Sequence, residues 1–209
     1  MADALTFYTN PMSRGRIVRW MLEEIGQPYE TKVLDYGTTM KAPEYLAVNP
    51  MGKVPAIKHG DAVVTECAAI CAYLADAFPQ ANLAPASLKD RAAYYRWMFF
   101  AAGPVEAAST NTAMGVVVPP ERKGMVGYGS LGEVVDALER AVDGREFIAG
   151  DRFSAADVYI GAQIGWGLQF GWLEKRPAFA AYSSRLQARP AATRAREIDD
   201  ALMAAQKKD

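Results

Sequence analysis

The chain has 209 residues, of which 51% are hydrophobic and 22% are charged. This balance is typical of a soluble globular protein. It excludes an intrinsically disordered chain, because there is enough apolar surface to offset the entropy of folding. Lysine and arginine number 23 against 24 aspartate and glutamate residues, and the resulting formal net charge of −1 argues against a dedicated nucleic-acid-binding protein.

Short sequence signals exclude several other classes. No apolar run reaches the ~18 to 20 residues that a membrane span needs, so we expect no membrane segment. The segment 1–7 contains an aspartate and no basic residue, unlike a secretory signal. Cys67 and Cys71 are too few for a disulfide framework, and with the single histidine, His59, they lack the spacing of zinc ligands. We therefore expect a cytoplasmic protein that binds no metal.

Strand and helix signals alternate in the first part of the chain. In chain order, strands are predicted at 4–8 and 29–34 around a helix at 13–25, followed by a helical turn at 41–47, strands at 54–59 and 62–64, and a helix from 65 or 66 to 78. The apolar residues of the first helix repeat with the helical period: Ile17, Val18, Met21, Leu22 and Ile25. A β-α-β start followed by a β-β-α finish predicts a thioredoxin-like domain, with helices packed on a mixed four-stranded sheet.

Strand signals become scarce after residue 79. The segment 80–88, which follows Pro79, contains Pro85 and small polar residues without a period, and we interpret it as a linker. Helices are predicted at 90–105, 131–142, 155–167, 177–188 and 190–206, with a Gly- and Val-rich loop at 111–129. We therefore expect an α/β thioredoxin-like N-terminal domain at 1–79 and an all-α C-terminal domain at 89–209.

The turn before the first helix is one candidate site. Ser13 lies at the N-terminus of that helix, where free backbone N–H groups and the helix dipole favour an anion. The alternative is that Ser13 is only an N-cap, which is worth about 1 kcal/mol.

A second candidate site is the segment 49–57, Asn-Pro-Met-Gly-Lys-Val-Pro-Ala-Ile. A cis Val54–Pro55 bond would turn the N–H and C=O of Val54 outward, where a peptide ligand can pair with both. Because only about 5–6% of X-Pro bonds are cis, a trans proline at a strand start is the alternative.

A third candidate site is the start of the next helix, at Glu66 and Cys67. Backbone N–H groups at a helix start suit a carboxylate, and the Glu66 side chain suits an ammonium group. The alternative is an acid in the first turn that only complements the helix dipole.

In this order and at these spacings, the segments 8–16, 49–55 and 66–70 resemble the glutathione-site segments of the glutathione S-transferase family, in its cytosolic-type bacterial form. The segment 153–157 also resembles the family's capping box, in which Ser154 caps a helix and Asp157 follows three residues later. The linker and the helical second half fit the family too, so the resemblance covers nearly the whole chain.

The resemblance implies a site for glutathione, the expected co-substrate. Val54, before a cis Pro55, pairs its backbone with the cysteine of glutathione, and Glu66 helps to hold the γ-glutamyl group. Cys67 stands where many members have serine. Its N–H still serves a carboxylate, but its thiol is a poorer donor than a hydroxyl. Lys41 and Lys53 either meet the glycyl carboxylate or are solvated surface charges.

The resemblance also implies a residue that activates the glutathione thiol, since a free thiol has a pKa near 8.5. Ser13 is the preferred catalytic candidate, and Tyr8 and Asn10 are the alternatives. Arg14 and Arg16 either add a positive field near the thiolate or lie on a solvated helix face.

The C-terminal domain is expected to form the pocket for a hydrophobic electrophile. Each candidate lining residue has core or dimer packing as its alternative, and the candidates are Met12, Tyr94, Trp97, Met98, Phe100, Trp166 and Phe170.

The sequence therefore predicts a glutathione transferase, a cytoplasmic detoxification enzyme that attaches glutathione to small hydrophobic electrophiles. We expect a homodimer without nucleic-acid or membrane partners. The alternatives on the same fold are a glutathione-dependent isomerase, peroxidase or ether-cleaving enzyme, and a non-catalytic binding module. The presence of Val54, Pro55 and Glu66 argues against the binding module, whereas Cys67 mildly favours it.

Overall fold

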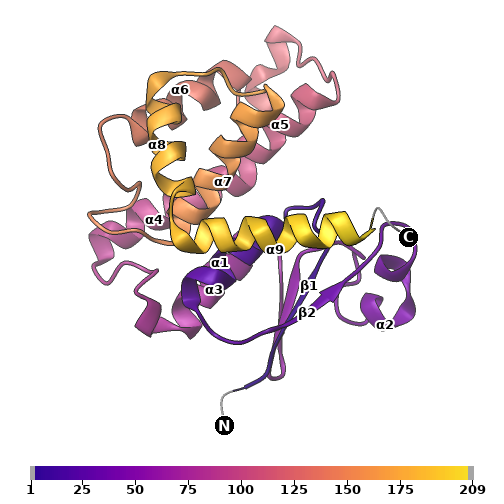
Figure 1. The fold of residues 1–209 in the computed structure, drawn as a ribbon. Coiled ribbons are helices and arrows are strands. Elements are labelled where there is room, and N and C mark those ends of the chain that lie inside the picture. Colours follow the sequence, from indigo (N-terminus) through magenta and orange to yellow (C-terminus); the bar gives the residue numbers. More distant parts are fainter. Residues whose placement is uncertain (1–2, 207–209) are drawn as a thin grey trace. The chain divides into compact units, whose positions relative to one another are not determined.

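A computed structural model describes residues 3–206 of the protein. The chain divides into two compact units (Figure 1). One unit comprises the chain up to Leu83 together with the chain from Arg189 onward, and the other spans Ala84–Ala188.

The first unit is built on a four-stranded sheet with the strand order β2-β1-β3-β4. Strand β1 pairs parallel with β2 and antiparallel with β3, and β3 pairs antiparallel with β4. The elements of this unit are β1 Leu5–Thr9, α1 Gly15–Ile25, β2 Glu30–Val33, α2 Pro43–Leu46, β3 Ala56–His59, β4 Ala62–Thr65, α3 Cys67–Ala77 and α9 Pro190–Gln206. The predicted thioredoxin-like arrangement, a mixed four-stranded sheet with helices, is confirmed.

The alternation of side chains along β1 separates the two faces of the sheet. Phe7 is fully buried and pairs with Ile57 of β3, which is also fully buried. The guanidinium of Arg19 on α1 lies 4.9 Å from the centroid of the Phe7 ring, so α1 covers this face. Tyr8 points to the other face, where its ring lies 5.4 Å from the ring of Tyr45 on α2.

The predicted apolar stripe of α1 is confirmed, because all of its members are buried: Ile17, Val18, Met21, Leu22 and Ile25. The helix begins at Gly15 rather than at residue 13. Residues 10–13 instead form a turn in which the Ser13 N–H donates to the Asn10 carbonyl at 3.0 Å. Gly26 ends the helix with φ +64°, a conformation that glycine adopts without steric cost.

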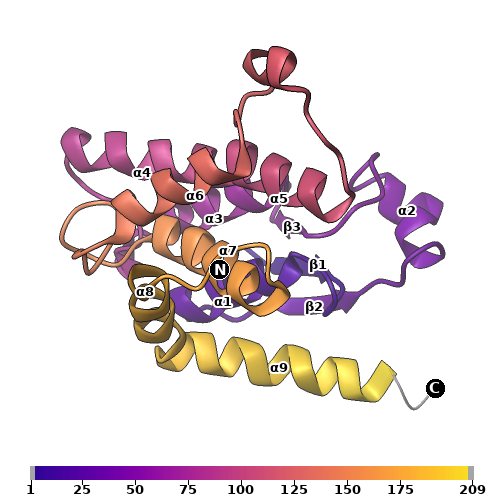
Figure 2. The same ribbon diagram turned by 90° about the horizontal axis from the view of Figure 1, so that it is seen from above.

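Helix α9 differs from the prediction in the unit to which it belongs. The sequence groups 190–206 with the other C-terminal helices, whereas in the structure α9 packs along α1 and completes the first unit (Figures 1 and 2). Two ion pairs accompany this docking: Arg189, immediately before α9, pairs with Glu24 at 2.7 Å, and Arg194 of α9 pairs with Glu23 at 3.2 Å. These partners lie more than 160 positions apart in the sequence, so no local pattern indicates the contact.

The second unit, Ala84–Ala188, is built from helices, as predicted, and no strand occurs in that range. Its helices are α4 Leu88–Phe100, α5 Glu106–Ala113, α6 Leu131–Val142, α7 Ala155–Phe170 and α8 Pro177–Gln187.

The predicted helix at 90–105 continues further than expected. A π-helical segment, Ala101–Val105, joins α4 to α5 and contains Pro104. A proline removes one backbone donor, and the wider π turn accommodates this loss within a continuing helix. Beyond α5, the segment that leads to α6 extends away from the helices of this unit and contains a 3₁₀ turn at Pro120–Met125 (Figure 2).

The capping box at the start of α7 is confirmed. The Asp157 carboxylate accepts from the Ser154 N–H at 2.9 Å, from the Ile148 N–H at 2.8 Å and from the Tyr182 hydroxyl at 2.6 Å. Burial raises the pKa of the Asp157 carboxyl, and the hydrogen bonds oppose that rise. The box therefore joins three segments of the second unit.

Candidate functional site

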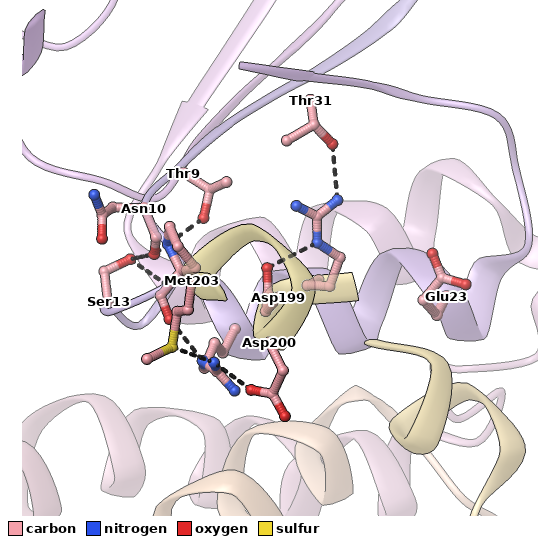
Figure 3. A network of polar contacts seen from close by, with 12 residues as sticks. Thr9, Asn10, Ser13, Glu23, Thr31, Asp199, Asp200 and Met203 are labelled. Carbon is pink, nitrogen blue, oxygen red and sulfur yellow. Dashed lines mark hydrogen bonds and ion pairs between the residues drawn. The ribbon is translucent and has the colours of Figure 1, made fainter. Parts of the chain in front are cut away.

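The turn that leads into α1 is closed by hydrogen bonds among its own residues (Figure 3). The Ser13 hydroxyl donates to the Asn10 carbonyl at 2.7 Å and accepts from the Gly15 N–H at 2.9 Å. A Cβ at Gly15 would clash with Thr9 Oγ1, so only glycine permits this close approach. The turn thus holds Ser13 at the entry of α1, where the first N–H groups of the helix have no intrahelical partner.

Two of the three predicted thiol-activating residues have different roles in this turn. Both polar atoms of the Asn10 side-chain amide are hydrogen-bonded. Nδ2 donates to the Leu34 carbonyl at 2.8 Å, and Oδ1 accepts from the Met12 N–H at 2.9 Å. Asn10 is also buried, which makes it a structural tie between the turn and the end of β2. Ser13 is half-buried, and its hydroxyl can rotate, so it is the better placed of the two to meet a ligand.

Tyr8, the third candidate, lies in a small apolar cluster on the α2 side of the sheet. This cluster consists of Met40, Tyr45 and Ala56, with Tyr8, Leu34, Val48 and Val54 packed against them. Lys32 Nζ lies 5.7 Å from the centroid of the Tyr8 ring. The structure therefore brings Tyr8 together with Val54, one of the predicted glutathione-binding residues.

The Val54–Pro55 peptide bond is cis. The carbonyl of Lys53, immediately before it, accepts from the Tyr45 hydroxyl at 2.5 Å and from Asn49 Nδ2 at 2.8 Å. Burial raises the pKa of Tyr45 to about 12, so this hydroxyl remains a donor at neutral pH. Two side chains thus fix the backbone that enters the cis bond.

No sequence-based prediction assigns a role to Tyr45 or to the Asn49 side chain. Asn49 belongs to the Asn-Pro-Met-Gly-Lys-Val-Pro segment that carries the resemblance, and its spacing of four residues from Lys53 is a signal that a turn analysis can use. Tyr45 has no such signal, because its contact depends on how α2 folds over the loop.

The two predicted lysines differ in their surroundings. Lys41 Nζ donates to the carbonyls of Met51 and Gly52 at 3.0 and 2.9 Å, so it closes the loop before the cis bond. An ammonium group carries three donors, and two of them are used here. Both Lys41 and Lys53 are exposed to solvent.

The start of α3 combines backbone strain with an uncapped helix end. Glu66 has φ +66° and ψ 121°, an uncommon conformation for a residue other than glycine, and its side chain makes no capping hydrogen bond. The first N–H groups of α3 therefore lack a side-chain cap at this position. The exposed Glu66 carboxylate lies next to them, so the helix start offers donors for an anion beside an acceptor for a cation.

Cys67 connects the starts of α1 and α3. Its buried thiol donates to the carbonyl of Arg14 at 3.7 Å, a weak hydrogen bond typical of sulfur. Cys67 and Cys71 are both buried thiols that form no disulfide. The Cys67 side chain thus serves packing between two helix starts, while its backbone remains in the first turn of α3.

The predicted electrophile-pocket residues fall into two groups by exposure. Tyr94, Trp97 and Met98 of α4 are buried, which favours the packing alternative for them. Met12 and Phe170 are each 71% exposed. Phe100 and Trp166 are half-buried, and the Phe100 ring lies 5.4 Å from that of Trp97.

Residues 3–206 contain neither a candidate membrane span nor a candidate metal-binding cluster. Between residues 3 and 206, no helix has the length and apolar character to cross a membrane. Over the same range, no three or more His, Cys, Asp or Glu side chains are grouped so that they could hold a metal ion.

Comparisons with known proteins agree with this fold. The model of the glutathione S-transferase N-terminal domain matches residues 12–77, and that of the glutathione S-transferase C-terminal domain matches residues 117–190. The solved structure of a glutathione transferase from Methylococcus capsulatus is 30% identical to this chain. It has a TM-score of 0.77 over 94% of this chain and 99% of that one. The chain belongs to the glutathione S-transferase family.

Two further relatives are informative. Glutathione S-transferase 1 of Zea mays is 30% identical over an alignment of 138 residues. The match covers 62% of this chain and 64% of the maize protein, so it spans less than two thirds of that relative. A sphingomonad glutathione S-transferase was solved in complex with glutathione. It is 28% identical, with a TM-score of 0.74 over 93% of this chain and 98% of that one.

Proposed function

We propose that the protein is a glutathione transferase, which activates the thiol of glutathione for attack on small hydrophobic electrophiles. The observation that carries this proposal is the start of α3. There, strained Glu66 stands beside an uncapped helix N-terminus, in the same unit as the cis Val54–Pro55 bond and the Ser13 turn. Membership of the glutathione S-transferase family supports it.

Glutathione carries groups that suit each part of this site. Its γ-glutamyl carboxylate suits the N–H groups at the start of α3, and its ammonium group suits Glu66. Its cysteine backbone suits the N–H and C=O of Val54. The glycyl carboxylate suits Lys53 better than Lys41, because Lys41 already donates to two carbonyls. The sphingomonad relative that was solved with glutathione supports this choice of ligand.

Cys67 changes one element of the proposed binding mode. Because its thiol is directed to the Arg14 carbonyl, the contribution left to it is that of its backbone N–H. We therefore expect weaker binding of the γ-glutamyl carboxylate than a serine at this position would give, without loss of the site.

Ser13 is the residue that we propose to activate the thiol. Its hydroxyl proton is engaged with the Asn10 carbonyl, and it must rotate to reach a thiolate. The exchange is favourable, because a hydrogen bond to a charged acceptor is roughly twice as strong as one between neutral groups. Donation to the thiolate lowers the thiol pKa and raises the fraction ionised at neutral pH.

The proposed function also includes the contacts with the electrophile, the cellular role and the assembly of the protein. Met12, Phe100, Trp166 and Phe170 remain candidates for contact with the electrophile, because none of them is fully buried. We also propose a role in detoxification, a cytoplasmic location and a homodimer. Light scattering with mass determination tests the homodimer.

Substitution of Ser13 tests the proposed function. At pH 7, Ser13→Ala is expected to lower kcat/KM for a model aromatic halide by about tenfold for each unit by which the thiol pKa rises. The rising limb of the pH profile is expected to move to higher pH, because the lost hydrogen bond stabilised the thiolate.

Ser130→Ala is the matched control. Ser130 accepts a hydrogen bond from the Glu133 N–H at the start of α6, so this variant also loses a bond from a backbone N–H to a serine hydroxyl, away from the proposed site. Wild-type turnover in Ser130→Ala is expected. Turnover in Ser13→Ala within a few-fold of wild type, with an unmoved pH profile, would show that Ser13 is not the activating residue.

A further inference from the structure

The C-terminal helix reaches the Ser13 turn through one side chain. Helix α9 packs along α1, and Asp200 and Met203 of α9 lie beside the turn that carries Asn10 and Ser13 (Figure 3). The connecting side chain is that of Arg16, in the first turn of α1.

Arg16 makes contacts in two directions at once. Its Nε donates to the Pro11 carbonyl at 2.6 Å, and its Nη2 donates to Asp200 Oδ1 at 2.7 Å and to Met203 Sδ at 2.8 Å. Side chains on a helix point toward its N-terminus, so residue 16 is suitably placed to reach back to the preceding turn. The planar guanidinium holds these donors in a fixed relation, which the flexible ammonium of lysine does not.

We propose that Arg16 is a positioning residue for the thiol site: anchored by Asp200 of α9, it holds the Pro11 carbonyl and thereby sets the position of the Ser13 hydroxyl. This inference deepens the proposed function and rests on it, because it assigns to α9 a role at the site that activates glutathione.

The contact with Arg16 gives the turn a further point of attachment. The Asn10 side chain fixes its first residue to the Leu34 carbonyl, whereas the bonds of Ser13 close the turn on itself. Pro11 lies between these residues and has no N–H with which to attach to the rest of the fold. Its carbonyl bond to Arg16 is short and charge-assisted, the stronger class of hydrogen bond.

The exposure of the pair indicates positioning rather than general stability. The Arg16 side chain is 24% exposed and that of Asp200 is 58% exposed. Ion pairs as exposed as this one contribute little to folding. A small misplacement of a reacting group, by contrast, has a large effect on catalysis.

Two variants and one control test the proposal in the full-length protein. Arg16→Lys keeps the positive charge but loses the guanidinium fork. Asp200→Ala keeps Arg16 and removes its anchor. Arg194→Lys is the control, because Arg194 on α9 also contacts α1, through Glu23, but away from the Ser13 turn.

The first readout is the kinetics of glutathione conjugation across pH. Arg16→Lys is expected to lower kcat about tenfold, the effect of one charge-assisted hydrogen bond, with less change in KM for glutathione. It should also move the rising limb of the pH profile to higher pH. Asp200→Ala is expected to act in the same direction by about two- to fivefold. Arg194→Lys is expected to match wild type.

The second readout requires no activity. Amide hydrogen exchange of the Met12, Ser13 and Gly15 N–H groups is expected to accelerate about tenfold in Arg16→Lys, and to stay at the wild-type rate in Arg194→Lys. If wild type neither binds glutathione nor turns over, the proposed function fails, while this exchange measurement still decides whether Arg16 orders the turn.

Three results would overturn the inference. Wild-type kinetics and exchange in Arg16→Lys would mean that any effect of Arg16 comes from its charge alone. Equal losses in Arg16→Lys and Arg194→Lys would mean that docking of α9 in general, and not the Pro11 contact, matters. Unchanged exchange in Arg16→Lys would overturn it even where turnover falls.

Discussion

At the scale of single residues, Glu66 has a backbone conformation that lowers stability and a carboxylate with a proposed role in binding. Its positive φ costs of order 1–3 kcal/mol for a residue with a side chain. Glycine would adopt this conformation freely. A strained glutamate at the uncapped start of α3 is consistent with a carboxylate that is needed at this position for binding.

Glu66→Gly is therefore expected to separate stability from binding. Without ligand, the free energy of unfolding should rise by about 1 kcal/mol, because relief of the positive φ exceeds the added flexibility of the unfolded chain. Affinity for glutathione should fall about tenfold through loss of the carboxylate that meets the ammonium group. Urea unfolding and calorimetric titration measure the two effects.

Asn82→Gly is the matched control for this prediction. Asn82 also has a positive φ, +54° with ψ 37°, but in the left-handed helical region that asparagine tolerates. Its replacement should change stability by less than about 0.5 kcal/mol and leave binding unchanged. A loss of stability in Glu66→Gly, or unchanged affinity, would contradict the account of Glu66.

Some residue-level features follow from sequence because they depend on local spacing. The Ser154–Asp157 capping box is an example, since both partners lie within one helical turn. The double use of the Ser13 hydroxyl is different. An N-cap and a thiol-activating serine have the same sequence signature, and only the contacts with Asn10 and Gly15 show that the turn already uses this hydroxyl.

At the scale of elements, α9 is attached to α1 by a buried ion pair as well as by surface pairs. Arg19 and Asp199 are each 1% exposed, with Nε 3.2 Å from Oδ1. Arg19 also donates to the Tyr29 hydroxyl at 3.0 Å and to Thr31 Oγ1 at 2.7 Å. Arg19 Nη2 and Asp199 Oδ2 find no hydrogen-bond partner among the described residues. The pair is thus incompletely satisfied, and its two charges depend on each other.

Removal of one partner is expected to cost far more than removal of both. Asp199→Leu should lower the free energy of unfolding by about 3–5 kcal/mol, because it leaves the Arg19 charge buried and unpaired. The double variant Arg19→Met with Asp199→Leu should recover most of that loss. Urea denaturation with fluorescence detection measures both.

Asp200→Asn provides the comparison for this pair of variants, because Asp200 is the neighbouring residue and its pair with Arg16 is exposed. It should cost less than about 1 kcal/mol. If Asp199→Leu is as mild as Asp200→Asn, the buried pair does not hold α9 on α1.

Element boundaries depart from the sequence prediction where non-local contacts or proline decide them. The amphipathic stripe of α1 is visible in the sequence, but its first residue depends on the turn at Ser13. The π-helical segment around Pro104 connects α4 to α5. Helix α5 has no apolar stripe, so its sequence does not show the helical period. Hydrophobic periodicity predicts helices that bury one face, and it does not predict a helical extension that lacks such a face.

At the scale of the whole molecule, the proposed glutathione contacts gather in one unit. Ser13, Val54 and Glu66 all belong to the thioredoxin-like unit, which α9 completes from the other end of the chain. The order of elements in this unit follows from the sequence, whereas the place of α9 does not, because its ion pairs join residues about 180 positions apart. The C-terminal helix is therefore part of the unit that binds glutathione in this account.

Calorimetric titration of the wild-type protein with reduced glutathione at neutral pH tests the central claim most directly. We expect one site for each chain, with a dissociation constant in the micromolar to low-millimolar range. The absence of binding heat at several temperatures would contradict it. The start of α3, with Cys67 in place of serine, would then not form a glutathione site. The proposal of a transferase would be replaced by that of a non-catalytic binding module on the same fold.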